Sequence, residues 1–152
     1  MRKTIFVDFD DTLCLHLYRN KVDKHIFDEI PEACDYFYNE CELNEPLYSY
    51  LAREQENCDL ILLSSASSKM LDIKKFWLDK YCPKLKFKDY IAVSIDINKS
   101  QIMLAYSQKF DVPIGDIVFI DDSRDERWSA ELEGFCTFNP QLLMNAEYKS
   151  KN

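Results

Sequence analysis

An acidic cluster directly follows the first apolar segment of the chain. Residues 4–7 are apolar or β-branched, and the next five, Asp8-Phe9-Asp10-Asp11-Thr12, carry three carboxyl groups and a hydroxyl. This abrupt change is typical of a buried parallel strand that delivers its carboxyl end to a site. A carboxylate such as Asp8 can attack phosphorus and become an aspartyl-phosphate. A second carboxylate two residues later, Asp10, can protonate the leaving oxygen and then activate water if its pKa is raised.

Two later segments repeat this pattern of an apolar run that ends in polar residues. Residues 60–63 run into Ser64-Ser65, and residues 117–120 run into Asp121-Asp122-Ser123-Arg124-Asp125. Because the carboxyl ends of parallel strands meet outside the same edge of a sheet, we expect these side chains to converge with Asp8 and Asp10. Lys99 stands just before the helix that precedes the last of the three segments.

So many carboxylates in one place require a compensating cation. Asp8, Asp10, Asp121 and Asp125 would repel one another if they were gathered without one, and hard oxygen ligands in that number suit Mg²⁺. Serine and lysine side chains would hold the oxygens of a transferring phosphoryl group. The sequence therefore predicts a magnesium-dependent phosphoryl-transfer site.

Strand and helix patterns alternate along the chain, which predicts an α/β fold with a Rossmann-like parallel sheet in a three-layer sandwich. Besides the strands already named, we expect strands over residues 90–95 and 135–138 and helices over 70–81, 100–110 and 124–133. Residues 13–57 are expected to form an irregular flap or small helical insertion. Within it, Pro31 and Glu32 suit the first turn of one helix, and Asn44 could cap a second one that begins near Pro46.

The length and composition limit the possible functions. A chain of 152 residues fits one domain, here residues 1–152, and the formal net charge of −8 disfavours a nonspecific nucleic-acid binder. A lysine-rich stretch is interpreted as a solvated surface. It comprises Lys74, Lys75, Lys80, Lys84, Lys86 and Lys88. We expect no membrane span and a cytoplasmic location, because the chain opens without a leader and contains no long apolar run.

The cysteine pattern predicts no structural zinc site. The six cysteines include no CxxC pair, and only His16 and His25 could complete a soft-metal site. Most of the cysteines are expected to be small core residues. Both histidines are expected to lie on the surface of the flap, outside the site.

At the level of motifs, Val7-Asp8-Phe9-Asp10-Asp11-Thr12-Leu13 resembles the DxDxT first motif of the haloacid dehalogenase (HAD) superfamily of phosphatases. Ser64 resembles the second motif, Lys99 the third, and Asp121-Asp122 with Asp125 the acidic fourth, in that family's order. The resemblance extends from about Thr4 to Asp125.

The resemblance implies a role for each matching position. Asp8 would be the nucleophile and Asp10 the general acid and base, supported by Thr12. A serine, Ser64 or its neighbour Ser65, would bind the phosphoryl group. Lys99, with Lys69 as the alternative, would neutralise its charge. Asp121, with Asp125 or Asp122, would hold Mg²⁺ beside Asp8 and the main-chain carbonyl of Asp10.

Other functions remain open at this point. A phosphoacceptor receiver module is disfavoured, because it would need its phosphorylated aspartate at the end of a middle strand in the chain order. A catalytically silent domain of the same fold, binding a metal or a partner, is the main competitor. Capless members of the superfamily often act on bulky substrates such as proteins or nucleic-acid ends. A small lid would favour a metabolite or nucleotide instead.

Overall fold

A five-stranded parallel sheet forms the centre of the protein in the computed structural model, which describes residues 2–16 and 41–143. The strand order is β5-β4-β1-β6-β7, and every neighbouring pair is parallel. The strands are β1 (Lys3–Val7), β4 (Cys58–Ser65), β5 (Phe87–Val93), β6 (Ile117–Ile120) and β7 (Cys136–Phe138). The expected parallel α/β sheet is confirmed.

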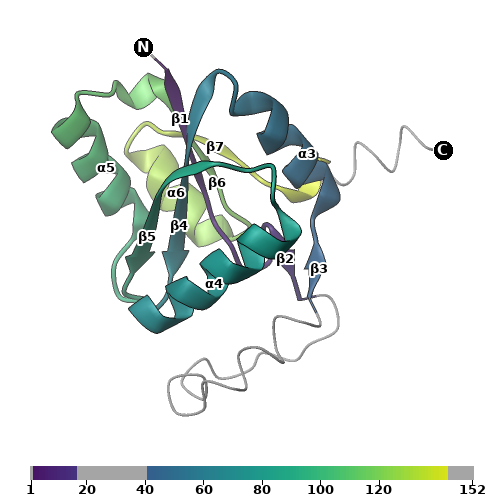
Figure 1. Ribbon diagram of the computed structural model, residues 1–152. Coiled ribbons are helices and arrows are strands. Elements are labelled where there is room, and N and C mark those ends of the chain that lie inside the picture. The colour runs from purple at the N-terminus through teal and green to yellow at the C-terminus, as the bar shows by residue number, and fades with distance from the viewer. Residues whose placement is uncertain (1, 17–40, 144–152) are drawn as a thin grey trace.

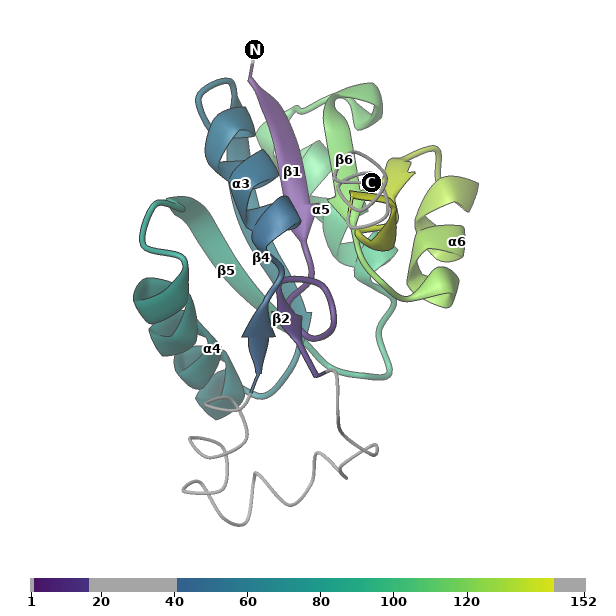
Figure 2. The ribbon, with the colours of Figure 1, turned by 90° about the vertical axis from the view of Figure 1, so that its right-hand side faces the viewer.

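Helices cover both faces of the sheet, as Figures 1 and 2 show from two directions. They are α3 (Glu45–Glu54), α4 (Ser68–Tyr81), α5 (Lys99–Phe110) and α6 (Arg124–Leu132), and a 3₁₀ turn, η1, spans Ile114–Asp116. A separate antiparallel ladder pairs β2 (Cys14–Leu15) with β3 (Glu42–Leu43). Among the described residues, no helix has both the length and the apolar character that crossing a membrane requires.

The central strand β1 is buried on both faces, which fixes the point from which the acidic cluster starts. Because successive side chains of a strand point to opposite faces, Ile5 and Val7 join the core beneath α3 and α4, whereas Phe6 joins the core beneath α5 and α6. Phe9 continues the first of these cores and packs edge-on against Trp77, with ring centroids 5.3 Å apart. As a result, β1 can shift only if both cores repack.

A tight turn follows β1 and carries the acidic residues. The carbonyl oxygen of Phe9 accepts backbone hydrogen bonds from Thr12, Leu13 and Cys14, at 3.0 to 3.2 Å. Asp11 adopts a left-handed conformation with φ of 57°, which aspartate tolerates better than most residues. The turn reverses the chain within a few residues and leads directly into β2.

Asn44 connects this turn to the first described helix, in agreement with its expected capping role. Its Oδ1 accepts the backbone N–H of Leu47 in the first turn of α3 at 3.3 Å, and its Nδ2 donates to the carbonyl oxygen of Thr12 at 2.9 Å. Its own backbone N–H donates to the carbonyl oxygen of Leu13. The residue is 1% exposed, so these hydrogen bonds are made away from water.

Most expected elements lie within a few residues of their observed bounds, and two expectations need comment. The expected strand over residues 90–95 begins earlier, since β5 spans Phe87–Val93. The expected helix starting at Pro31 falls mainly outside the described residues. The apolar spacing after Pro31 predicts this helix through Leu43, and its last part is wrong, because Glu42 and Leu43 form β3 and pair with Leu15 and Cys14.

Replacing Asn44 should separate its capping role from its contact with the turn. We expect Asn44→Ala to lower the free energy of unfolding by about 1–3 kcal/mol, because it removes a helix cap and leaves a buried carbonyl without its donor. Asn44→Ser keeps a neutral acceptor for the helix but loses the donor to Thr12, so urea denaturation should place it between the wild type and Asn44→Ala. Equal stability of all three proteins would contradict this account.

Candidate active site

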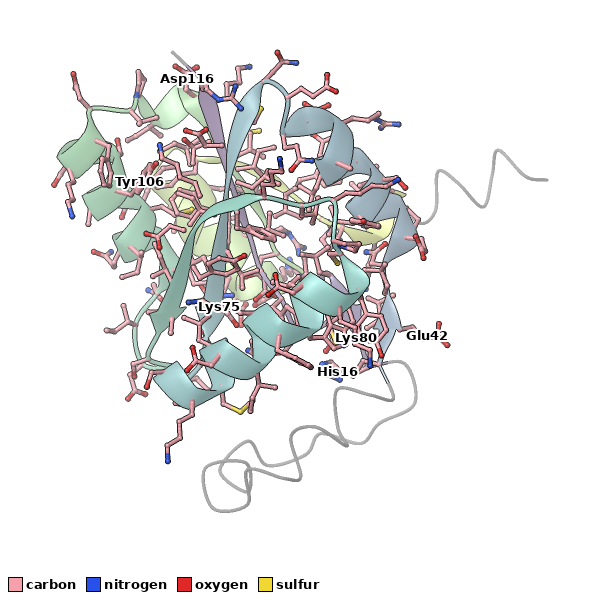
Figure 3. All side chains as sticks on the ribbon, viewed as in Figure 1. His16, Glu42, Lys75, Lys80, Tyr106 and Asp116 are labelled. Atoms are coloured by element: carbon pink, nitrogen blue, oxygen red, sulfur yellow. The ribbon has the colours of Figure 1, made fainter. Side chains whose placement is uncertain are left out.

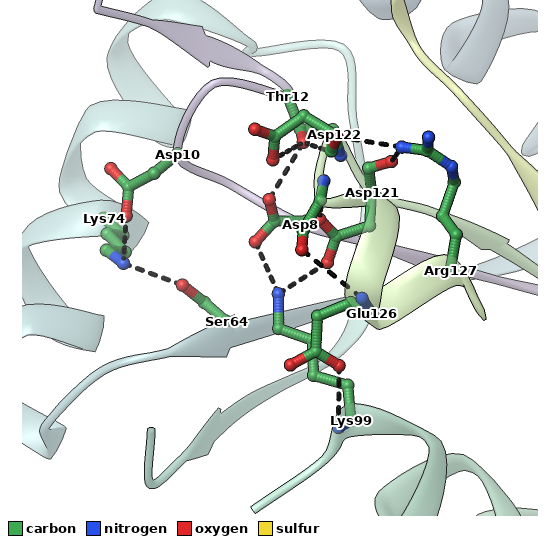
Figure 4. A network of polar contacts seen from close by, with 11 residues as sticks. Asp8, Asp10, Thr12, Ser64, Lys74, Lys99, Asp121, Asp122, Glu126 and Arg127 are labelled. Carbon is green, nitrogen blue, oxygen red and sulfur yellow. Dashed lines mark hydrogen bonds and ion pairs between the residues drawn. The ribbon is translucent and has the colours of Figure 1, made fainter. Parts of the chain in front are cut away.

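A cavity of about 260 Å³ opens at the carboxyl ends of the strands. Residues from the ends of β1, β4 and β6, from the segment after β5, and from the starts of α5 and α6 contribute to its walls. The lining residues are Asp8, Asp10, Asp11, Ser64, Ser65, Ile95, Lys99, Asp121, Asp122, Ser123 and Glu126. Figure 4 shows the polar network at its base.

A buried lysine joins two carboxylates at the centre of this network. The Nζ atom of Lys99 lies 2.8 Å from Asp8 Oδ1 and 2.7 Å from Asp121 Oδ2. All three residues are buried. Burial alone would lower the pKa of Lys99, but the carboxylates of Asp8 and Asp121 outweigh it and raise that pKa above its usual value. Lys99 is therefore a permanent cation in the site.

The end of β6 places two more carboxylates, Asp121 and Asp122, beside Asp8. Oxygen atoms of Asp8, Asp121 and Asp122 lie within 4.8 Å of one another. Burial, followed by the charge of Asp8, raises the pKa of Asp121 to about 6. Burial and interactions with Asp8 also raise the pKa of Asp122, to about 8. One ammonium group does not fully offset three carboxylates, and a donor set made only of carboxylate oxygens fits a hard divalent cation.

Backbone and side-chain hydrogen bonds hold these carboxylates in place. Thr12 Oγ1 donates to Asp8 Oδ2 at 2.9 Å and accepts the backbone N–H of Asp122 at 3.2 Å. The backbone N–H of Ser123 donates to Asp121 Oδ1 at 2.8 Å. Arg127 Nη1 donates to the carbonyl oxygens of Asp121 and Asp122, both at 2.8 Å. The end of β6 is thereby tied to the turn after β1.

The Asp10 carboxylate belongs to a different group of residues from the one around Asp8. Its Oδ2 lies 2.8 Å from Lys74 Nζ, and its Oδ1 lies 2.9 Å from His16 Nε2. Lys74 also donates to Ser64 Oγ at 2.7 Å, so it bridges the ends of β1 and β4 from helix α4 (Figure 4).

Comparison with known proteins agrees with this arrangement at the level of the fold. No protein-family model and no curated protein matches the sequence. Among solved structures, a HAD family enzyme from Bacteroides thetaiotaomicron in a magnesium complex superposes with a TM-score of 0.63 and 16% identity, over 91% of this chain and 93% of that one. A predicted HAD-like family hydrolase from Porphyromonas gingivalis gives a TM-score of 0.61 and 16% identity, over 92% and 91%. The chain has the haloacid dehalogenase-like fold.

A third solved structure that matches this chain comes from a larger assembly. A chain of the Pnkp1/Rnl/Hen1 RNA repair complex matches with a TM-score of 0.59 and 20% identity. The match covers 91% of the present chain but 42% of that one. The B. thetaiotaomicron enzyme has also been solved with magnesium and inorganic phosphate together.

The structure gives the positions of the lysines and serines that the sequence left as alternatives for the phosphoryl-binding site. Lys99 contacts Asp8, whereas Lys69 is exposed at the start of α4 and does not line the cavity. Both Ser64 and Ser65 line the cavity, but Ser64 is buried and accepts from Lys74. That contact leaves the hydroxyl hydrogen of Ser64 able to donate elsewhere.

Two expectations about individual site residues are wrong. Thr12 donates to Asp8 rather than supporting Asp10, because the turn carries Asp10 away toward α4. For the same reason, the Asp10 carboxylate does not gather with those of Asp8, Asp121 and Asp122, and the expected magnesium contact through the main-chain carbonyl of Asp10 stays a prediction. Asp125 is exposed in the first turn of α6 and does not line the cavity. Its neighbour Glu126 does, and Glu126 Oε2 accepts the backbone N–H of Lys99 at 3.1 Å.

Two residues that contact Asp10 are missing from the predicted site. Lys74, expected on a solvated surface, is 1% exposed. Its position carried a signal, because it follows Met70 by four residues and precedes Trp77 by three, which places it on the apolar stripe of α4. His16, expected on the surface of the flap, lies just after β2 (Figure 3) and contacts Asp10. Local sequence gave no such signal for His16, and His25 lies outside the described residues.

The neighbouring lysines of α4 offer a matched pair for testing the buried contact. We expect Lys74→Met to lower the free energy of unfolding by about 1–3 kcal/mol, because Asp10 and Ser64 lose a buried partner while His16 remains. Lys75, whose ammonium lies over the Tyr90 ring, should cost about 1 kcal/mol or less when changed to Met. Urea denaturation measures both, and equal losses would contradict the special position of Lys74.

The raised pKa of Asp122 predicts a specific pH dependence of the metal-free protein. Over the range between the unfolded value near 3.8 and the folded value of about 8, the native state holds a proton that the unfolded chain has released. The contribution of Asp122 to the free energy of unfolding is therefore complete below the unfolded pKa. It decreases as the pH rises toward the folded pKa of about 8. Asp122→Asn removes this loss. With EDTA, we expect urea denaturation to show that raising the pH from 5 to 8 costs the variant less stability than the wild type, by on the order of 1–2 kcal/mol.

The exposed Asp125 provides the control for this experiment. Asp125→Asn removes one formal charge from the same helix end but lies outside the carboxylate cluster. Its pH dependence of stability should follow the wild type. If both substitutions flatten the profile equally, net charge rather than the buried cluster is responsible.

Proposed function

We propose that this chain is a magnesium-dependent phosphomonoester hydrolase that works through an aspartyl-phosphate on Asp8. The observation that carries the proposal is the setting of Asp8, which lies at the floor of a cavity with one oxygen on Lys99 and the other on Thr12. A fixed carboxylate with a neighbouring ammonium suits attack on an anionic phosphoryl group, because the cation reduces the repulsion between them.

Three carboxylates would hold the magnesium ion. Asp8, Asp121 and Asp122 bring their oxygens together and lack full compensation by Lys99. A bound Mg²⁺ would supply positive charge to the oxygens of the phosphoryl group. The magnesium and phosphate complexes of the B. thetaiotaomicron enzyme, which shares the fold, support this choice of ion.

Asp8 and Asp10 have a defined role in each of the two half-reactions. In the first, an Asp8 oxygen forms a bond to phosphorus, the ester P–O bond breaks, and the leaving oxygen takes a proton from Asp10. In the second, the oxygen of a water molecule forms a bond to phosphorus, the bond to Asp8 breaks, and Asp10 takes the proton from that water. Lys99 and Ser64 would hold the phosphoryl oxygens in both steps. Lys74 and His16 keep the Asp10 carboxylate in one orientation.

The substrate is proposed as a phosphomonoester, and a screen has to find its class. Nucleotides, sugar phosphates, phosphopeptides and oligonucleotides with 3′- or 5′-phosphates cover both small and bulky substrates. The similarity to a chain of an RNA repair complex supports including the oligonucleotides. The competing proposal, a silent domain of the same fold, predicts no phosphate release from any of them.

Substitutions at the two central aspartates should distinguish these proposals. We expect magnesium-dependent phosphate release by the wild type and a decrease of about 10³-fold or more in kcat for Asp8→Asn, because the nucleophile is lost. Asp10→Asn should slow the second half-reaction more than the first when the leaving group is a good one. With p-nitrophenyl phosphate, mass spectrometry should then detect a phosphoryl group on Asp8.

Asp125→Asn is the matched control, because it changes a nearby aspartate outside the cavity. It should retain magnesium-dependent release close to that of the wild type. Phosphate release that persists in purified Asp8→Asn would contradict the assignment of Asp8 as the nucleophile. A wild-type protein that is inactive on every substrate class would favour the catalytically silent domain.

A further inference from the structure

A cluster of soft ligands lies at the β2–β3 ladder, outside the proposed magnesium site. Cys14 pairs with Leu43 and Leu15 with Glu42, so one more antiparallel step places His16 opposite Cys41. The Sγ atoms of Cys14 and Cys41 and a ring nitrogen of His16 lie within 4.8 Å of one another. The cysteine pattern alone predicts no zinc site because these residues share no local motif, and only the ladder brings them together.

The two ring nitrogens of His16 have different partners. Its Nε2 lies 2.9 Å from Asp10 Oδ1, and its Nδ1 lies 3.0 Å from Cys41 Sγ. When Asp10 is ionised, its carboxylate only accepts hydrogen bonds, so Nε2 then carries the proton, and Nδ1 is the nitrogen directed at Cys41 Sγ. Metal-binding histidines characteristically use their second nitrogen to donate to a carboxylate in this way.

We propose that Cys14, His16 and Cys41 bind a thiophilic divalent cation, with Zn²⁺ as the natural occupant. Two sulfur ligands and one imidazole suit zinc and are poor ligands for Mg²⁺, whereas the Asp8 cluster offers only carboxylate oxygens. The part of the chain that the structure describes supplies three ligands, and a fourth tetrahedral position is available to water or an added thiol. Binding of this cation does not require the proposed hydrolase activity.

Coordination has a simple balance of bonds and protons. The cation forms one bond to each sulfur and one to His16 Nδ1, and the protons of the two thiols, with any proton on Nδ1, pass to solvent. Burial, followed by interactions with Cys41, raises the pKa of the Cys14 thiol in the metal-free protein. A bound dication supplies the positive charge that a buried thiolate otherwise lacks.

The contact between His16 and Asp10 links this cluster to the proposed acid–base residue. A cation on Nδ1 fixes the ring and leaves the Nε2 proton on the Asp10 side. Loss of the Asp10 acceptor should therefore weaken cation binding although Asp10 touches no cation.

Cobalt spectroscopy tests the site directly, because Co²⁺ replaces Zn²⁺ and gives a charge-transfer absorption when thiolates bind it. The reduced full-length chain is titrated with Co²⁺ in excess Mg²⁺, and Zn²⁺ is then added. We expect saturation at one equivalent, a thiolate-to-cobalt band, and its loss on addition of Zn²⁺. Cys41→Ser and His16→Gln should remove or strongly weaken the band, and Asp10→Asn should lower the affinity about 10–100-fold.

Two controls separate this site from other cysteines and from the magnesium site. Cys136→Ser removes an exposed cysteine on β7 and should leave the titration unchanged. Asp8→Asn should also retain the thiolate band, so the result does not depend on the proposed phosphatase mechanism. Circular dichroism establishes that each variant is folded.

Three outcomes would overturn the proposal. One is the absence of a thiolate band in the reduced wild type, and another is a band that survives in folded Cys41→Ser. The third is equal loss of the band in Cys136→Ser, which would assign the binding to cysteines outside the cluster.

Discussion

The shared ion pair of Lys99 with Asp8 and Asp121 is the interaction on which the rest of the site depends. Three charged side chains are buried together at the end of the central strand, where an unpaired charge would be costly. The lysine arrives from the start of α5, and the two carboxylates arrive from β1 and β6. The parallel sheet is therefore what makes this cluster possible, because it brings three distant segments to one edge.

The turn after β1 divides the site into two halves. Asp8 faces Lys99 and the end of β6, whereas Asp10 faces Lys74 on α4 and His16 at the end of β2. Each half thus contains a buried lysine against a carboxylate, and Phe9 between them anchors the turn in the core. This separation suits two carboxylates with different tasks, since different surroundings stabilise different protonation states.

The sequence predicts the parts of this arrangement that depend on apolar runs and on the polar residues directly after them. Residues 117–120 are predicted as a strand and form β6, and the acids after it do reach the cavity. The missed features depend on where a side chain points after regular structure ends. The hydroxyl of Thr12, the Asp10 carboxylate and the choice of Glu126 over Asp125 are set by the turn after β1 and by the first turn of α6, which periodicity does not encode.

The two halves should also differ in how firmly they are held. The Asp8 half rests on β1 and β6, whose side chains are buried in both cores. The Asp10 half rests partly on the β2–β3 ladder, a two-stranded element that is marginal by itself and is joined to the core through Leu13, Cys14 and Asn44. A cation that clamps Cys14, His16 and Cys41 would stiffen this weaker half. The position of the proposed acid–base residue is therefore more open to adjustment than the position of the proposed nucleophile.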